Sequence, residues 1–320
     1  MRQMWTQGVT IGAAVPSGSG SWIAAALALA IAVTAVTTHL WLRGTTLAAP
    51  AAWGFWSGVT IFAVEGSLAM GSVNPLWDSL WHYAAAAGTF CPLMGVLGAK
   101  RPQDRGWQWV VLSLWVILLV PAMQAVAARS GHRLELYGAW RLLLAALIAM
   151  GLLNYLPTRF ALAAILFAIG QALLLGPYLF TITTSGEGWR VAGLVLILAA
   201  AATARVISSR RVAVSSDDGK SSTTARFNAR WFAFRDGWGA FWGLRVMQRV
   251  NQTAELSGWP VRLEWWDGIA PIAVGDDAAA NELTLDSQSV AHIQQTLDSL
   301  LRRFERLDAA ESNSGGRSSC

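Results

Sequence analysis

Long apolar runs are the feature that most constrains this chain. Seven stretches of about 20 residues, the length that an α-helix needs to cross roughly 30 Å of hydrocarbon, follow one another in the first two thirds of the sequence. They cover residues 22–42, 51–73, 80–98, 107–127, 137–155, 160–183 and 189–208. Ten of the twelve tryptophans before residue 209 lie near an end of one of these stretches, as in the aromatic belts of membrane proteins. The pattern predicts an all-α polytopic membrane protein with seven transmembrane helices.

The composition agrees with a bilayer environment. Apolar residues make up 54% of the chain and charged residues 13%, and the mean hydropathy is +0.41. A soluble globular protein carries about 25% charged residues, so this chain lacks the polar groups that would cover a surface facing water. We therefore predict that the lipid bilayer is the main partner of residues 22–208.

Charge divides the chain into two parts. Residues 1–208 contain 11 Lys and Arg against 5 Asp and Glu, whereas residues 209–320 contain 13 against 14. Because the basic excess sits in the loops between apolar stretches and the last third is nearly neutral, the isoelectric point near 9.8 does not indicate a nucleic-acid partner. The high Arg to Lys ratio, 22 to 2, is typical of GC-rich bacterial coding sequences. A bacterial cytoplasmic (inner) membrane is the predicted location.

The positive-inside rule predicts the orientation. The loops on the side of the amino terminus hold four basic residues, and those on the other side hold nine. We predict that residues 1–21 form a short segment outside the cytoplasm and that the carboxyl-terminal third lies in the cytoplasm. The stretch 80–98 is the weakest of the seven because it contains His82 and Cys91-Pro92, and the alternative is that it enters the membrane without crossing it.

The last third is predicted to be a linker followed by a small domain. Residues 209–225 are polar and small, which indicates a linker, and residues 226–308 are predicted to form a helical or mixed cytoplasmic domain. Residues 309–320 are predicted to be disordered. Within the domain, Val261 and Leu263 alternate with charged residues, which indicates a short strand and a hairpin.

An aromatic stripe begins this domain. Its members recur at spacings of four and three, which indicates one helix face: Phe227, Trp231, Phe234, Trp238 and Phe241. The glycines between residues 237 and 243 are expected to weaken this helix and to divide it. We favour the stripe as the core of a folded domain; the alternative is a basic, aromatic helix that lies on the inner leaflet.

A heptad seam ends the domain. Apolar residues recur at spacings of three and four between 290 and 307, after a candidate cap at Asp286. Fewer than three heptads make a marginal coiled coil, so two alternatives stay open. The helix at 287–307 docks on the aromatic stripe, or it mediates self-association or binds a protein partner.

Several classes of membrane protein are excluded by the residues that the chain lacks. The only lysines, Lys100 and Lys220, fall in a loop and in the tail, so no retinal Schiff base is expected. The apolar stretches contain no aspartate, and the chain has neither an HExxH motif nor a nucleotide-binding loop. His39 and His82 are predicted at opposite surfaces, which excludes them as a haem pair. We expect no cofactor, no metal and no catalytic residue, and we place an enzyme third among the candidate functions.

One group of polar residues carries the functional hypothesis. Glu65 is the only acidic residue within an apolar stretch, and a carboxylate at that depth costs at least about 2.5 kcal/mol unless it is paired, protonated or hydrated. His82, Gln124 and Arg141 are predicted to lie at the same outer level. The four residues form a candidate polar pocket that opens outward and binds a proton or a small cation. The alternative is a structural ion pair between Glu65 and Arg141.

The sequence therefore leaves two main functional hypotheses. The first is a transport or sensing protein whose outer pocket is coupled to a cytoplasmic regulatory domain. The second is a structural or assembly protein whose cytoplasmic domain recruits a partner.

Overall fold

The computed structural model describes residues 19–71, 74–127, 134–180, 187–215, 223–272 and 287–305. The first eighteen residues of the predicted outer segment 1–21, the predicted cap Asp286 and the predicted disordered tail 309–320 lie outside these residues. In the described part the helices are α1 (Ser19–Trp41), α2 (Ala48–Ala69), α3 (Pro75–Gly88), α4 (Cys91–Leu97), α5 (Asp104–Leu118), α6 (Val120–Ala127), α7 (Gly138–Tyr155), α8 (Ala161–Leu174), α9 (Gly176–Leu179), α10 (Glu187–Ser215), α11 (Thr223–Leu256) and α12 (Ser287–Leu301). One antiparallel hairpin joins β1 (Val261–Glu264) to β2 (Gly268–Pro271).

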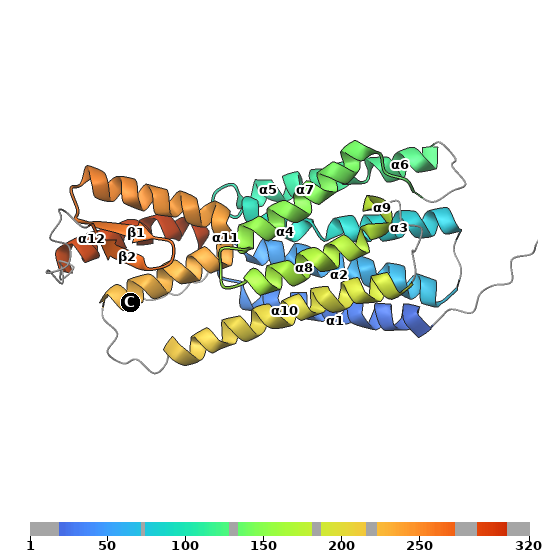
Figure 1. Cartoon of the computed structure of the whole chain (residues 1–320), viewed down its shortest axis with the longest axis horizontal. Coiled ribbons are helices and arrows are strands. Elements are labelled where there is room, and N and C mark those ends of the chain that lie inside the picture. Colours follow the sequence, from blue (N-terminus) through green and yellow to red (C-terminus); the bar gives the residue numbers. More distant parts are fainter. Residues whose placement is uncertain are drawn as a thin grey trace, which may run out of the picture.

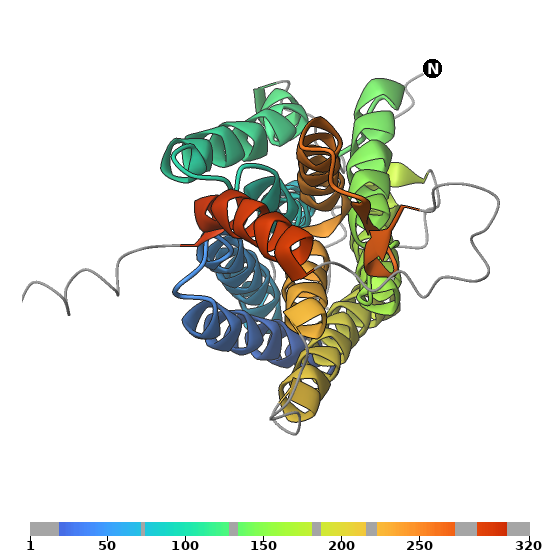
Figure 2. The ribbon, with the colours of Figure 1, turned by 90° about the vertical axis from the view of Figure 1, so that its left-hand side faces the viewer.

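Helices α1 to α10 form an elongated bundle, and α11, the hairpin and α12 group at one end of it (Figure 1). We call this the domain end of the bundle, and the opposite end the far end. Viewed from the domain end, α12 and the two arms of α11 lie over the ends of the bundle helices (Figure 2). The last third of the chain is therefore a separate layer at the domain end.

The bundle has the character of a membrane protein. Four helices of the described part are long and apolar enough to cross a membrane, namely Gly20–Trp41, Arg105–Ala127, Gly138–Tyr155 and Gly188–Ser209. Large apolar side chains point outward on one of these, α7, where Leu142 is 72% and Leu153 62% exposed, and on the shorter apolar helix α8, where Leu162 is 57% exposed. The other predicted stretches coincide with α2, with the pair α3 and α4, and with the pair α8 and α9. That all seven cross the bilayer stays a prediction.

Three of the predicted stretches are interrupted just before a proline. The interruptions precede Pro92, Pro121 and Pro177, which cannot donate the helical hydrogen bond. At two of them, side chains of other helices satisfy nearby backbone carbonyl groups. Ser57 Oγ donates to the carbonyl oxygen of Gly88 (2.7 Å), Gln171 Nε2 to that of Thr89 (3.3 Å), and Tyr83 Oη to that of Leu118 (2.7 Å). Such bonds hold interrupted helices together inside a bilayer.

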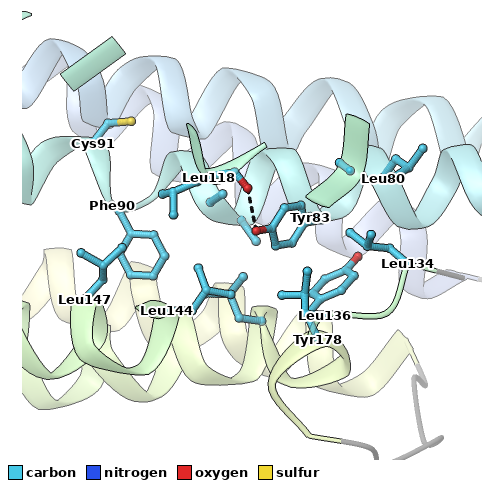
Figure 3. Packing of buried hydrophobic residues seen from close by; sticks show 14 of the residues in the cluster. Leu80, Tyr83, Phe90, Cys91, Leu118, Leu134, Leu136, Leu144, Leu147 and Tyr178 are labelled. Carbon is cyan, nitrogen blue, oxygen red and sulfur yellow. Dashed lines mark hydrogen bonds between the residues drawn. The ribbon is translucent and has the colours of Figure 1, made fainter. Parts of the chain in front are cut away.

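The apolar core of the bundle lies next to these interruptions. Figure 3 shows Tyr83 donating to the carbonyl of Leu118 beside Tyr178, with Phe90 packed toward Leu144 and Leu147. The rings of Tyr83 and Tyr178 meet edge to face, with centroids 5.1 Å apart. Because Tyr83, Phe90 and Leu144 are at most 1% exposed, the middle of the bundle is closely filled.

Helices α1 and α2 approach closely at Gly58. A Cβ atom added there would lie 2.8 Å from the Cα atom of Ala32 and 2.9 Å from its backbone nitrogen. We expect Gly58→Ala to destabilise the protein by about 1–3 kcal/mol, because the two backbones must separate. Thermal unfolding in detergent micelles measures the effect. Gly66→Ala, at an α2 position with no such neighbour within 4 Å, is the matched control and should match or exceed wild-type stability.

The last third of the chain folds around the predicted aromatic stripe. Its core consists of buried side chains from α11, the hairpin, α12 and the 3₁₀ turn at Arg302–Phe304: Phe227, Trp231, Phe234, Trp242, Val246, Val250, Val261, Leu263, Ile269, Ile293, Leu297, Leu301 and Phe304. The seam of α12 therefore docks on the stripe, with Ile293 and Leu297 fully buried. Phe241 differs from the rest of the stripe because it follows a bend and is 39% exposed.

The bend in α11 is at Gly239. Its backbone angles, φ 77° and ψ −173°, are not helical, and they divide α11 into two arms, as the glycines predicted. Helices reach into the predicted linker, residues 209–225, from both sides. The apolar helix α10 continues to Ser215, and α11 begins at Thr223, because short polar side chains adjoining a helix do not force it to stop. Residues 216–222 lie outside the described part.

The bend, which we call the α11 tip (residues 235–242), docks on the domain end of the bundle. Asp236 accepts a hydrogen bond from Arg159 (2.7 Å), the backbone N–H of Phe241 donates to Asn154 Oδ1 (2.9 Å), and Trp242 Nε1 donates to the carbonyl of Val96 (2.9 Å). Arg159, Asn154 and Val96 lie at or just beyond the ends of α7 and α4. The domain is thus fixed to the bundle by directional polar contacts.

Candidate functional site

The candidate site lies at the far end of the bundle, around the buried carboxylate of Glu65. This residue is in the last turns of α2, and it is 1% exposed. Its Oε1 atom lies 3.2 Å from Nε2 of His82 in α3 and 3.8 Å from Nε of Arg190 in the first turn of α10. The Oε2 atom is buried and has no hydrogen-bond partner among the described residues. Three helices thus contribute ionisable side chains to a single cluster.

The hydrogen bonds of His82 determine what this cluster can do. Its Nδ1 atom lies 2.9 Å from the carbonyl oxygen of Asp78 and 2.9 Å from the carboxylate oxygen of the same residue. Both oxygens accept hydrogen bonds when the carboxylate is ionised, so Nδ1 carries a hydrogen in that state. Asp78 and His82 are four residues apart on α3, so their side chains lie on the same face of the helix.

The other nitrogen of His82, Nε2, lies near one hydrogen-bond donor and one acceptor. Nε2 lies 2.8 Å from Nη1 of Arg190 and 3.2 Å from Oε1 of Glu65. A guanidinium only donates hydrogen bonds, and an ionised carboxylate only accepts them. A neutral His82 therefore accepts from Arg190, whereas a protonated His82 donates to Glu65 and loses the bond from Arg190. The geometry gives the imidazole one partner for each protonation state.

A cavity of about 140 Å³ adjoins the cluster. Glu65, Asp78, His82 and Arg190 all line it, together with apolar and aromatic residues of α2, α3, α8, α9 and α10. This volume has room for several water molecules. On one wall, Tyr178 Oη donates to the carbonyl of Ser79 (2.6 Å), which fixes α9 against α3. Polar groups and water-sized space therefore occur together at the far end.

The structure brings together two of the four residues that the sequence singled out. Glu65 and His82 are in contact, but neither Gln124 nor Arg141 lines the cavity. Gln124 is exposed on α6, and Arg190, not Arg141, is the arginine beside Glu65. Sequence position gives the depth of a residue along a helix, but it does not give the direction in which the helix turns it. The pocket therefore contains Asp78 and Arg190 in place of the predicted Gln124 and Arg141.

Asp78 and Arg190 were missed because each lies at the end of an apolar stretch, where a charge needs no special explanation. A signal for Asp78 was present, since it precedes His82 by four residues on the same helix face. Arg190 was counted among the loop charges of the outer side. Long arginine side chains at helix ends reach inward as well as outward, so its position in the first turn of α10 was compatible with either role.

The described residues contain no group of three or more His, Cys, Asp or Glu side chains that could hold a metal ion. Cys91 is buried and is not in a disulfide. Comparison of the chain with protein-family models, curated proteins and solved structures finds no significant match.

Proposed function

We propose that this chain is a membrane sensor that binds a proton at His82, between Glu65 and Arg190, and that its carboxyl-terminal domain reports or regulates that state. The observation that carries the proposal is the position of Nε2 of His82 between a carboxylate and a guanidinium. Because the two protonation states select different partners, uptake of one proton changes which helix is bonded to α3.

The charge of the cluster favours a proton over a larger cation. When both carboxylates are ionised, Glu65, Asp78 and Arg190 together carry −1. A proton on His82 brings the total to zero. A metal cation would instead need to displace Arg190, which already lies 3.8 Å from Glu65. The ligand of the pocket around Glu65 is therefore a proton.

Sensing is favoured over transport by the filling of the bundle. On the domain side of the cavity, buried apolar side chains fill much of the interior, among them Phe90, Leu118 and Leu144 (Figure 3), and the buried polar groups there, Ser57, Thr89 and Gln171, hydrogen-bond to one another or to backbone carbonyls. A proton moving toward the domain end would have to cross this cluster. A bond exchange at the far end requires no such path.

We propose the topology along with the function. All seven stretches cross the membrane, the amino terminus is outside, and the carboxyl-terminal domain lies in the cytoplasm of a bacterial cell. The domain docks at the end of the bundle that contains Lys100 and Arg159, the basic side of the predicted topology, which supports this orientation.

The proposal is tested by following the titration of His82 directly. The chain contains four histidines, so nitrogen NMR of histidine-labelled protein in nanodiscs gives few signals, and His82→Asn identifies the one that matters. In wild type this signal should change with pH over the range in which the protein stays folded. We expect Glu65→Gln to lower its midpoint by about 1–3 pH units, because a neighbouring negative charge that favours the imidazolium is lost. Arg190→Gln should raise it.

Arg141→Gln is the matched control, since Arg141 does not line the cavity, and it should leave the midpoint unchanged. Coupling to the domain is measured by hydrogen exchange of residues 235–242, which should change with the same midpoint as His82. A His82 signal that does not titrate, or a midpoint that Glu65→Gln leaves in place, would show that the cluster is only a structural lock. A titrating His82 without any change in the α11 tip would refute the regulatory role of the domain.

A further inference from the structure

A second group of charged residues lies at the domain end, around Trp242. The Cζ atom of Arg245 lies 5.4 Å from the centroid of the Trp242 ring and 4.2 Å from that of Phe241. Lys100 Nζ, from the segment between α4 and α5, lies 5.9 Å from the Trp242 ring. Two cations from distant parts of the sequence thus lie within 6 Å of the centroid of one indole ring.

This group lies at the level where the bundle helices end. Trp242 Nε1 donates to the carbonyl of Val96 in the last turn of α4, and the N–H of Phe241 bonds to Asn154 in the last turn of α7. In the proposed topology, these turns are where two membrane spans meet the cytoplasmic surface. The cations around Trp242 are therefore at the height of the lipid headgroups.

The surface here is basic and partly apolar. Within the described residues, neither Lys100 nor Arg245 has a carboxylate within ion-pair distance, in contrast to Arg230 and Arg262 further along the domain. Beside them, Phe241 is 39% and Leu244 50% exposed. Cations next to exposed apolar side chains at a membrane surface match the chemistry of a phospholipid, which has an anionic phosphate above acyl chains.

We propose that Lys100 and Arg245 bind the phosphate of an anionic phospholipid in the leaflet that faces the carboxyl-terminal domain. Phe241 and Leu244 contact the upper part of the same lipid. The exposed side chain of Leu153 in α7 is next in sequence to Asn154, which bonds to the backbone of Phe241, so an outward-facing apolar side chain of the bundle lies close to the site. The lipid bridges the α4–α5 segment and the second arm of α11, and thereby holds the domain against the membrane. The proposal rests on the proposed topology but not on the proton site.

The test is native mass spectrometry of the full chain, released from nanodiscs that contain phosphatidylglycerol or phosphatidylcholine. We expect retention of phosphatidylglycerol, and about a fivefold loss of its binding constant for each of Lys100→Gln and Arg245→Gln, the effect of one charge near a lipid surface. Arg249→Gln is the matched control, because it removes an exposed charge from the same arm one turn further from the bundle. It should have no effect.

Three results would overturn the lipid site. Equal retention of the two lipids would remove the charge argument. If Arg249→Gln lowered the binding constant of phosphatidylglycerol as much as Arg245→Gln, the lipid would be held by a diffuse attraction to the basic surface and not by a defined site. Displacement of the lipid by millimolar glycerol 3-phosphate would identify a soluble phosphate compound as the ligand instead. The melting temperature of each variant, measured in phosphatidylcholine, separates these results from misfolding. The titration of His82 is unaffected by any of them, so the two proposals fail independently.

Discussion

Asp236→Asn is expected to destabilise the docked carboxyl-terminal domain by about 3–5 kcal/mol, the cost of removing one partner from a buried ion pair. Asp236 is 3% exposed, and its neighbour Arg235 is 4% exposed. One carboxylate oxygen accepts from Nε (3.0 Å) and Nη2 (2.8 Å) of Arg235, and the other accepts from Nε of Arg159 (2.7 Å). Asparagine keeps the shape but leaves Arg235 buried without a counter-charge.

The effect is measured by chemical denaturation in nanodiscs, with protease sensitivity of the domain as a second readout. Glu264→Gln is the control, because its partner Arg262 is exposed, Glu264 is itself partly exposed, and such a surface pair contributes at most about 1 kcal/mol. Equal effects of the two substitutions would show that the contact between Arg159 and Asp236 does not hold the domain to the bundle.

Gly239→Ala should release the α11 tip from the bundle. The angles φ 77° and ψ −173° belong to a region that essentially only glycine adopts, so alanine adds about 1–3 kcal/mol of backbone strain. In addition, its Cβ atom would lie 2.2 Å from Nδ2 of Asn154 and 2.8 Å from the backbone oxygen of that residue. Since the two costs add, the contact between Phe241 and Asn154 is expected to break.

Hydrogen exchange of residues 235–242 measures this release, and Gly237→Ala is the control in the same segment. At Gly237 the nearest neighbour of an added Cβ is a side-chain atom of Leu47 at 3.6 Å, an ordinary contact distance. We expect Gly237→Ala to keep the tip protected. Protection that survives in Gly239→Ala would mean that the bend tolerates a side chain and that docking depends on other contacts.

Much of the fold follows from features that the sequence displays directly. The apolar stretches coincide with helices because their length and hydropathy are local properties. The prolines mark the helix interruptions, and Gly239 marks the bend of α11, because backbone chemistry acts within a few residues. The docking of α12 on the aromatic stripe was one of two alternatives, and the structure shows it, with Ile293 and Leu297 fully buried.

Less of the site could be predicted from the sequence, for a different physical reason. The carboxylate of Glu65 was identified because a charge at that depth is costly. Its partner depended on the rotation of each helix about its axis, and the outward-facing apolar surface that lipid permits weakens the usual signal for that rotation. Arg141 was taken as the candidate partner and Arg190 as a loop charge, and only packing distinguishes them. Likewise, nothing local to Asn154 or Val96 indicated that residues about 90 or more positions later would bond to them.

The contact at Thr46 has a consequence for the time course of synthesis. This residue, in the loop between α1 and α2, is fully buried, and its hydroxyl donates to the carbonyl of Ala99 (2.6 Å). Its N–H donates to the carbonyl of Phe304 (3.1 Å), a residue 258 positions later. At about 5–20 residues per second, a ribosome needs roughly 10–50 s to cover that interval. During that time the turn between α1 and α2 lacks the last partner of Thr46, so this turn is completed only after Phe304 has been made.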